Sequence, residues 1–391
     1  MKGPLKIAIL SWLVCQSLSD EASSKSRVAV IGGGIGGTTA ALFLREELGE
    51  DVEIVIFEKD KIGGRLATVE VGGRFYESGG AVIHPRNQYM SNLTKTLGLK
   101  EATDFPIPLT FGLYDGQDIL FQTHRYRFFS SFANKMRLLW RYGFDLFRLD
   151  PWISGLLNWY DDIYPAQARK TAFTSVYDMF HSLNALFDDL VTSAIGSYLT
   201  HLGFGKRFTH EIARIAMRNN YGQDLEIHAF VGAISLAGAQ GGLWSVRGGN
   251  YRVAEAAWEK SGARLVKNKV TEVVENEAGK GRRFVITSVD PNGESSDDEY
   301  DAVILAVPCT TAGCAGIKFS VEGIDAKLTK FPDSYHRTVA NFVKVLVTRN
   351  NEFLVMMGSC FFWKYQFLAF SSAGQIEHTI LWSGQLSSFP R

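Results

Sequence analysis

The chain has 391 residues, which is enough for one large domain or two closely packed ones. Its 41 lysines and arginines balance 41 aspartates and glutamates, so the sequence lacks the basic footprint of a nucleic-acid-binding protein. Apolar residues make up 46% and aromatic residues 13%, a composition that favours an apolar small molecule as ligand over a polyanion.

The first residues have the order of a secretory signal peptide. Lys2 and Lys6 precede the apolar run 7–15, and small residues at 17–19 offer a cleavage point. The apolar run is too short to cross a bilayer as a stable helix. We therefore expect a signal peptide over residues 1–19 and a mature protein in the secretory pathway.

The cysteines remaining after removal of the signal are Cys309, Cys314 and Cys360, and three cysteines cannot form a fully paired framework. Cys309 and Cys314 are close enough in sequence to bridge, but we expect both to be buried as small apolar side chains. Asn92 begins a glycosylation sequon, Asn92-Leu93-Thr94, which a secreted chain would use. No spacing typical of metal ligands occurs, so we expect no metal.

A nucleotide-binding pattern opens at the predicted strand 27–31. A glycine turn follows it, then a predicted helix over 38–48 and a second strand over 52–57 that ends at Glu58. The turn matches G-x-G-x-x-G, in which glycines allow a tight turn, close approach to a pyrophosphate and close helix packing. The helix N-terminus offers free N–H groups to phosphates, and an acid after the second strand accepts hydrogen bonds from ribose hydroxyls. The residues predicted to hold this part of a dinucleotide are Gly32, Gly34, Ile35, Gly36, Gly37, Glu58 and Lys59.

Further glycines favour FAD over a nicotinamide cofactor. Gly63-Gly64-Arg65 follows Glu58, and two short strands over 67–71 and 74–77 lead to Gly79-Gly80. A flavin that lies along the backbone for its whole length needs close approach at both its pyrophosphate and its ring, and an arginine offsets phosphate charge. We expect Gly64, Arg65, Gly79 and Gly80 to contact FAD.

Residues 125–240 have helical periodicity and are interpreted as an insertion that covers a cleft. Helices are predicted over 175–181, 183–202 and 208–217. Aromatic residues crowd 128–165 and either line an apolar cleft or pack the helical domain. They are Phe128, Phe129, Phe132, Trp140, Phe144, Phe147, Trp152, Trp159 and Tyr160.

The nucleotide-fold pattern then returns. A helix is predicted over 251–261, strands over 264–266, 269–275, 282–289 and 302–307, and an acidic turn over 290–300. A domain interrupted by another and later resumed is therefore expected.

The run 32–58, followed by Gly63-Gly64-Arg65-Leu66-Ala67-Thr68, resembles the FAD-binding start of the monoamine oxidase superfamily. Four more segments, 79–85, 139–144, 217–223 and 242–250, make the chain similar to the prenylcysteine oxidase (farnesylcysteine lyase) family over 27–345.

This resemblance implies an α/β fold, a Rossmann-like FAD-binding domain of the glutathione-reductase and amine-oxidase type with an inserted, largely helical substrate domain. The FAD-binding domain is expected over 27–124 and 241–310, and the substrate domain over 125–240 and about 311–350.

The resemblance also implies a reaction. Members of the family oxidise the thioether of S-farnesyl- or S-geranylgeranyl-cysteine with oxygen and water to cysteine, a prenyl aldehyde and hydrogen peroxide, as prenylated proteins are degraded. That task implies a lysosome or vacuole. The expected partners are prenylated cysteine and molecular oxygen, without nucleic acid or an obligate protein partner, and peripheral membrane contact stays open. The alternatives are another flavin enzyme of the amine oxidase or desaturase type, and an inactive truncated relative.

Four polar residues are candidates for the chemistry. His84 could orient substrate or activate water, although a structural imidazole is favoured. Tyr221 and Gln223 are candidates for the polar end of the substrate. Arg218 could pair with the substrate carboxylate or with a neighbouring acid such as Glu211. Val270 matches the position where such folds bind the adenine side through the backbone.

The resemblance to this flavoprotein superfamily ends at about Asn351. Flavoproteins of this superfamily end with a glycine-containing strand-to-helix turn against the flavin, and residues 351–391 contain none. We expect this tail to lack long strands or helices and the chain to be truncated. Loss of three or four hydrogen bonds, each worth about 1 kcal/mol, would weaken FAD binding.

Overall fold

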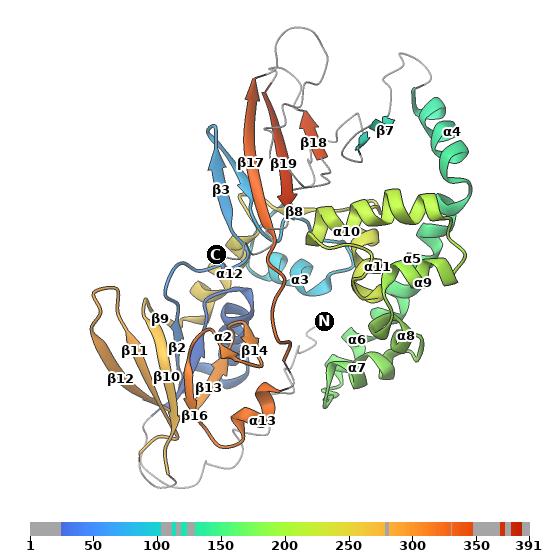
Figure 1. Cartoon of the computed structure of the whole chain (residues 1–391). Coiled ribbons are helices and arrows are strands. Elements are labelled where there is room, and N and C mark those ends of the chain that lie inside the picture. The colour runs from blue at the N-terminus through green and yellow to red at the C-terminus, as the bar shows by residue number, and fades with distance from the viewer. Residues whose placement is uncertain are drawn as a thin grey trace, which may run out of the picture.

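The computed structural model describes residues 25–102, 112–114, 119–122, 130–277, 281–329, 331–346, 368–371 and 377–384. The predicted signal peptide, Phe128, Phe129 and Cys360 lie outside these residues. Figure 1 shows two groups of elements: sheets with helices α2 and α12 on one side, and the run of helices from α4 to α11 on the other.

A four-stranded parallel sheet, in the order β13-β1-β2-β9, forms the centre of the nucleotide fold. Both faces of this sheet are covered, which explains why the predicted inner strands have nearly continuous apolar sequences. Val28 and Val30 face the side of α2 and α12, and Ala29 and Ile31 face a second sheet. The elements are β1 (Ser26–Ile31), α2 (Ile35–Leu48), η1 (Gly49–Asp51), β2 (Val52–Phe57), α12 (Tyr251–Ser261), β9 (Arg264–Val266) and β13 (Ala302–Leu305).

The second sheet has the order β12-β11-β10-β16, formed by β12 (Ser295–Tyr300), β11 (Phe284–Val289), β10 (Lys269–Glu275) and β16 (Lys318–Ser320). The acidic turn predicted over 290–300 is therefore wrong for its second half. β12 is an edge strand in which only Tyr300 is buried. Such a strand needs backbone pairing to one neighbour and carries little apolar periodicity, so its polar sequence did not indicate a strand.

The helices of the inserted segment pack around one apolar core. The single helix predicted over 183–202 is wrong. Ser193 and Ala194 are extended, Ala194 pairs with His228, and the N–H of Ile195 donates to the carbonyl of Ile227. The helices are α4 (Ser130–Tyr142), α5 (Asp145–Tyr160), α6 (Ile163–Ala168), α7 (Val176–Leu183), α8 (Leu186–Thr192), α9 (Ile195–His201), the π-helix η2 (Phe208–Ala213), α10 (Arg214–Tyr221) and α11 (Ala229–Ala237).

The aromatic residues of 128–165 have two different environments. Trp152 and Tyr160 pack against the helical core. By contrast, Phe132, Trp140, Phe144 and Phe147 are between 64% and 90% exposed. Side chains this exposed line no enclosed cleft among the described residues. The predicted role of lining an apolar cleft therefore does not hold for these four in the structure.

Short elements connect the larger ones. The predicted hairpin is present as β3 (Thr68–Val71) and β4 (Arg74–Glu77). The others are α3 (Gln88–Thr96), β5 (Glu101–Ala102), β6 (Gly112–Tyr114), β7 (Ile119–Gln122), β8 (Ser245–Val246), β14 (Cys309–Thr310), β15 (Gly313–Cys314) and α13 (Ile324–Leu328).

Two expectations near the C-terminal end are wrong. Cys309 and Cys314 are buried but form a disulfide, because the hairpin of β14 and β15 places them directly opposite each other with a Cα–Cα distance of 4.0 Å. Strands also form beyond residue 351. β18 (Leu368–Ser371) and β19 (Glu377–Gly384) pair with β17 (Val339–Leu346) in a sheet of order β17-β19-β18.

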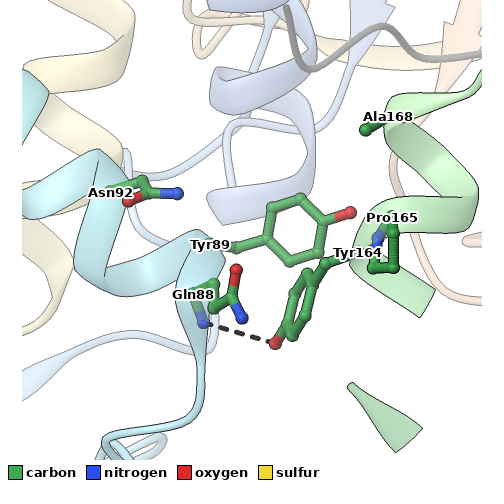
Figure 2. A pocket seen from close by; sticks show the side chains of 6 residues that line it. All are labelled: Gln88, Tyr89, Asn92, Tyr164, Pro165 and Ala168. Atoms are coloured by element: carbon green, nitrogen blue, oxygen red, sulfur yellow. Dashed lines mark hydrogen bonds between the residues drawn. The ribbon is translucent and has the colours of Figure 1, made fainter. Parts of the chain in front are cut away.

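A surface pocket of about 330 Å³ lies where α3 meets α6. Gln88, Tyr89 and Asn92 line it from α3. Tyr164 and Pro165, together with Ala168, line it from α6 (Figure 2).

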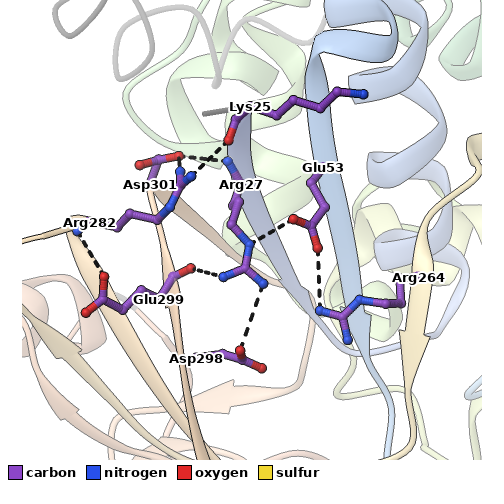
Figure 3. Close-up of polar contacts among 8 residues, drawn as sticks. All are labelled: Lys25, Arg27, Glu53, Arg264, Arg282, Asp298, Glu299 and Asp301. Carbon is purple, nitrogen blue, oxygen red and sulfur yellow. Dashed lines mark hydrogen bonds and ion pairs between the residues drawn. The ribbon is translucent and has the colours of Figure 1, made fainter. Parts of the chain in front are cut away.

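A charged cluster ties the amino-terminal end of β1 to the second sheet (Figure 3). The Arg27 guanidinium donates to Glu53 at 2.9 Å and to the carbonyl of Glu299 at 2.8 Å, and lies over the ring of Tyr300. The backbone N–H of Arg27 donates to Asp301 at 2.7 Å. These contacts fix the two sheets at the end opposite to the glycine turn.

Among the described residues, none of the helices combines the length and apolar character needed to cross a bilayer. The same residues contain no group of three or more His, Cys, Asp or Glu placed to hold a metal ion.

Candidate functional site

The glycine turn lies at the carboxyl edge of the parallel sheet, where ligands of such folds bind. It is anchored to the end of β2, because the N–H of Gly32 donates to the carbonyl of Phe57 at 2.8 Å. The carbonyl of Gly33 accepts a hydrogen bond from the N–H of Gly63 at 2.9 Å. The turn after β1 and the loop after β2 therefore form one backbone surface.

Three glycines of this turn have different steric surroundings. A Cβ at Gly37 would lie 1.9 Å from the carbonyl oxygen of Gly32, so only glycine allows α2 to pack this closely on β1. A Cβ at Gly36, by contrast, would meet nothing within 4 Å. A Cβ at Gly34 would lie 3.9 Å from the carbonyl oxygen of Gly63 and from the Cα of Gly64. The first turn of α2, whose N–H groups have no partner within the helix, thus borders open space beside a backbone cradle.

Glu58 lies at the edge of this cradle. Its Oε2 accepts a hydrogen bond from the N–H of Gly33 at 2.8 Å, and its Oε1 accepts one from the N–H of Asp60 at 2.9 Å. Each carboxylate oxygen keeps a second lone pair, so the group can still accept hydrogen bonds from a ribose. Lys59 is exposed and lies 4.0 Å from Asp60.

The predicted flavin segments meet beside the same cradle. The N–H of Gly80 donates to the carbonyl of Arg65 at 3.2 Å, and a Cβ at Gly79 would lie 1.8 Å from that carbonyl oxygen. Gly64, the neighbour of Arg65, has the Cα of Gly34 3.1 Å from its Cβ position. Arg65 itself is exposed.

Asn250 holds these loops together, a role that sequence reasoning missed. The side chain is 1% exposed. Its Oδ1 accepts from the N–H of Val246 at 2.8 Å, and its Nδ2 donates to the carbonyls of Gly80 at 2.7 Å and Ala81 at 3.0 Å. The only signal was its place at the end of the segment 242–250, directly before a predicted helix, where polar residues are common.

Glu77 completes the same contact. Its Oε1 accepts a hydrogen bond from the backbone N–H of Asn250 at 2.6 Å, whereas its Oε2 is buried without a partner among the described residues. Burial raises the pKa of Glu77 above its usual value, and the hydrogen bond from Asn250 opposes that shift in part.

Val270 lies in β10, next to a register shift between Val270 and Glu272. Its side chain is 5% exposed and belongs to the core that also contains Phe57 and Ile286. The predicted contact with adenine through its backbone stays a prediction.

His84 has both ring nitrogens engaged. Nδ1 accepts a hydrogen bond from the N–H of Arg86 at 3.2 Å, which leaves Nε2 to donate to Oε1 of Gln240 at 3.2 Å. Gln240 in turn donates to Asp150 and Ser154 of α5 at 2.8 and 3.0 Å. The imidazole therefore links the loop after Gly79-Gly80 to the helical segment.

Arg218 pairs with a neighbouring acid, one of its two predicted roles, but that acid is Asp224 and not Glu211, the example given above. α10 ends at Tyr221, and Gly222 adopts a left-handed conformation with φ of 63°, which returns the chain toward Arg218. Burial alone would raise the pKa of Asp224, but the hydrogen bond and charge of Arg218 hold it below its usual value. Gln223, partly exposed, lies in this turn.

Glu211 has other partners. Within the π-helix η2 it accepts two hydrogen bonds from Arg141, at 2.7 and 2.8 Å, and one from the hydroxyl of Tyr142 at 2.8 Å. Burial raises the pKa of Tyr142, and its hydrogen bond to Glu211 adds to the shift. The segment 139–144 is thereby fixed to the helix that leads into α10. Short π-helical stretches of this kind are frequent at functional sites.

Tyr221 lies at the end of α10, where burial raises the pKa of its hydroxyl. Its carbonyl accepts a hydrogen bond from Thr338 at 2.9 Å. The preceding Asn220 donates to Ser235 of α11, and α11 ends shortly before Gln240, the partner of His84. These contacts join Tyr221 to His84 through α11.

The glycine turn, the open first turn of α2 and the acid at the end of β2 define a dinucleotide-binding protein with a Rossmann-like domain. A family model for NAD(P)-binding Rossmann-like domains matches residues 30–97, the region that contains these elements. A second family model, prenylcysteine lyase, matches residues 128–361, more than half of the chain. The chain belongs to the prenylcysteine lyase family.

Curated relatives agree with this assignment. The chain is 36% identical over 345 residues to prenylcysteine oxidase 1 of Bos taurus, and 35% identical over 329 residues to the protein of the same name from Mus musculus. These matches cover 86% and 82% of this chain but only 66% and 62% of the relatives. The chain thus spans about two thirds of the length of the relatives that it matches.

Solved structures support the fold. A triple mutant of putrescine oxidase superposes with a TM-score of 0.52 over 92% of this chain and 75% of its own, at 16% sequence identity. A double mutant of the same protein gives a TM-score of 0.50 at 15% identity. At this identity the likeness concerns the fold and not the ligand.

Proposed function

We propose that the dinucleotide is FAD and that the chain is an FAD-dependent thioether oxidase acting on S-prenyl-L-cysteine. The observation that carries the choice of FAD is the continuity of the backbone cradle, from Gly34 through Gly64 and Arg65 to Gly80. A flavin extends past its pyrophosphate and needs backbone contact there, whereas a nicotinamide cofactor does not need this second loop. The relatives' name, prenylcysteine oxidase, supports the substrate.

The proposed overall reaction converts prenylcysteine, oxygen and water into cysteine, a prenyl aldehyde and hydrogen peroxide. FAD, when bound, would supply the two-electron acceptor for the allylic C–H bond next to sulfur. The first turn of α2 would bind the pyrophosphate through its free N–H groups and its positive dipole end. Glu58 would accept the ribose hydroxyls, and Arg65 would offset phosphate charge.

Other residues would position the substrate side. Asn250 would keep the loop of Gly80 and Ala81 in place against the cofactor through its two Nδ2 hydrogen bonds. His84, with Nδ1 occupied by the N–H of Arg86, would act through its Nε2 proton and orient Gln240 or a substrate atom that replaces it. Asp224 pairs with both Arg214 and Arg218, so this group of three side chains keeps one net positive charge, and Arg218 stays a candidate for the substrate carboxylate.

The test is spectroscopic. The purified protein, incubated with FAD and then desalted, should retain the visible absorption of a bound flavin. Anaerobic mixing with S-farnesyl-L-cysteine should bleach that absorption, and putrescine should not. A protein without bound flavin would refute the cofactor proposal. Bleaching by putrescine alone would refute the substrate proposal and favour an amine oxidase.

We further propose that the protein enters the secretory pathway and acts in a lysosome or vacuole. The support is the order of basic, apolar and small residues in 1–19 together with the sequon at Asn92. Expression with a fluorescent protein fused after residue 391 should give signal in acidic vesicles, and a diffuse cytosolic signal would contradict the proposal.

A further inference from the structure

The sequon residue Asn92 lies at the edge of the pocket between α3 and α6. Asn92 is exposed, and it lines this pocket together with Tyr89 of the same helix and Tyr164 of α6 (Figure 2). Tyr89 precedes Asn92 by three residues, so the two side chains share one face of α3. The pocket is therefore next to Asn92 Nδ2, the atom to which an N-linked glycan would be attached.

Thr94, the third residue of the sequon, supplies an independent observation. Its side chain is 1% exposed, and its hydroxyl has no hydrogen-bond partner in the described structure. A buried hydroxyl without a partner destabilises a fold, and a valine of similar shape would avoid that cost. The fold thus gains nothing from this hydroxyl, whereas the sequon Asn-x-Ser/Thr requires it.

The aromatic wall of the pocket is held in place. The hydroxyl of Tyr164 donates to the carbonyl of Arg86 at 3.0 Å and accepts from the N–H of Gln88 at 3.3 Å. The rings of Tyr89 and Tyr164 lie 5.4 Å apart between centroids, tilted by 58°. This fixed wall has faces of negative potential, which attract the weakly positive C–H groups on the apolar face of a sugar ring.

We propose that Asn92 carries an N-linked glycan whose first N-acetylglucosamine packs in this pocket against Tyr89 and Tyr164. The pocket, at about 330 Å³, is at the small end of ligand sites and suits one sugar ring rather than a chain. Gln88, the other polar side chain of the α3 wall, is within the pocket to meet the acetamido group.

The modification needs a lipid-pyrophosphate-linked oligosaccharide as donor. The Asn92 amide nitrogen bonds to the anomeric carbon and loses one proton, while the bond from that carbon to the pyrophosphate oxygen breaks and the lipid pyrophosphate leaves. Because the hydroxyl of Thr94 is buried in the fold, the transfer takes place before α3 packs. The inference rests on the proposed secretory route and is independent of the proposed FAD chemistry.

The experiment uses the full chain secreted from a eukaryotic host. Three forms are compared by thermal unfolding: the intact glycoprotein, the same protein trimmed with an endoglycosidase that leaves one N-acetylglucosamine, and N92Q. Peptide mass spectrometry should find the glycan on Asn92. The first two forms should melt together, about 2 °C above N92Q. Flavin absorption should be equal in all three, so that a failure here is distinct from a failure of the FAD proposal.

Two further variants test the pocket itself. In Y89A the gap in melting temperature between the single-sugar form and the N92Q form should vanish, whereas Y89F, which keeps the ring, should preserve it. T94V should lack the glycan and melt no lower than N92Q. The proposal is overturned if Asn92 is unmodified, if the gap is unchanged in Y89A, or if T94V melts clearly below N92Q.

Discussion

Replacement of Gly37 by alanine is expected to separate α2 from β1. The new Cβ would lie 1.9 Å from the carbonyl oxygen of Gly32, whereas Cβ atoms in real structures stay beyond 3.0 Å. Both partners are backbone, so no side-chain rotation relieves the contact and the helix must move by about 1 Å or more. Overpacking of a tight site costs about 1–3 kcal/mol, and a clash between two backbones belongs at the upper end.

Gly36 provides a matched control in the same turn of α2. Its Cβ would meet nothing within 4 Å, and alanine favours a helix over glycine by up to about 1 kcal/mol. G36A should therefore keep or slightly raise the free energy of unfolding. Because this open space is where the pyrophosphate is proposed to lie, G36A should still weaken FAD binding about tenfold, the equivalent of about 1.4 kcal/mol.

Urea unfolding of the protein without cofactor and titration of flavin fluorescence separate the two effects. G37A should lose about 3 kcal/mol of stability and also FAD binding, and G36A should lose only binding. If G37A is as stable as the wild type, the close contact of α2 with β1 is wrong. If G36A binds FAD as tightly as the wild type, the pyrophosphate does not lie on this turn.

Three other changes test the surroundings of the site. N250A removes three side-chain hydrogen bonds and should lower the free energy of unfolding in urea by about 3 kcal/mol. A loss below about 0.5 kcal/mol would show that Asn250 does not hold these loops together. Because the folded-state pKa of Glu77 is raised, its protonated form is favoured by folding, so wild-type stability should fall relative to E77Q as the pH rises from about 4.5. A constant difference between the two proteins from about pH 4 to pH 8 would refute this. The double variant C309S/C314S, which lacks the disulfide, should lose about 2 kcal/mol of unfolding free energy, since the bridge closes only a short loop. The wild type in reductant should melt at the same temperature as this variant, and a wild type that still melts higher would contradict the prediction.

The fold of the nucleotide-binding segment was predictable because its signals are local. The apolar strand 27–31, the glycine turn and the strand that ends at Glu58 each occupy a few consecutive residues, and the structure has β1, α2 and β2 there. The family model over 30–97 agrees. Helix α12 was predicted for the same reason, since its amphipathic pattern begins at Tyr251, shortly after the glycine pair Gly248-Gly249.

The contacts that sequence reasoning missed depend on tertiary structure. Asn250 bonds to Gly80, 170 residues away, and nothing near either residue indicates the other. The partner of Arg218 could not be chosen from sequence, because both Glu211 and Asp224 lie within one or two helical turns, and only the reversal at Gly222 decides between them. The disulfide was missed because pairing of Cys309 with Cys314 requires a tight hairpin. The strands of this hairpin are only two residues long, too short to show a strand pattern in the sequence.

The order of strands in the parallel sheet has a consequence for biosynthesis. β1 pairs with β13, and the paired residues Val28 and Ala302 are 274 positions apart. At about 5–20 residues per second, a ribosome needs roughly 14–55 s to make the chain between them. Until then one edge of β1 lacks its neighbour, while the helices from α4 to α11 are already complete and pack through nearer contacts. Folding during synthesis is therefore expected to begin in the helical segment, and the unpaired edge of β1 is the place where a chaperone would be needed first.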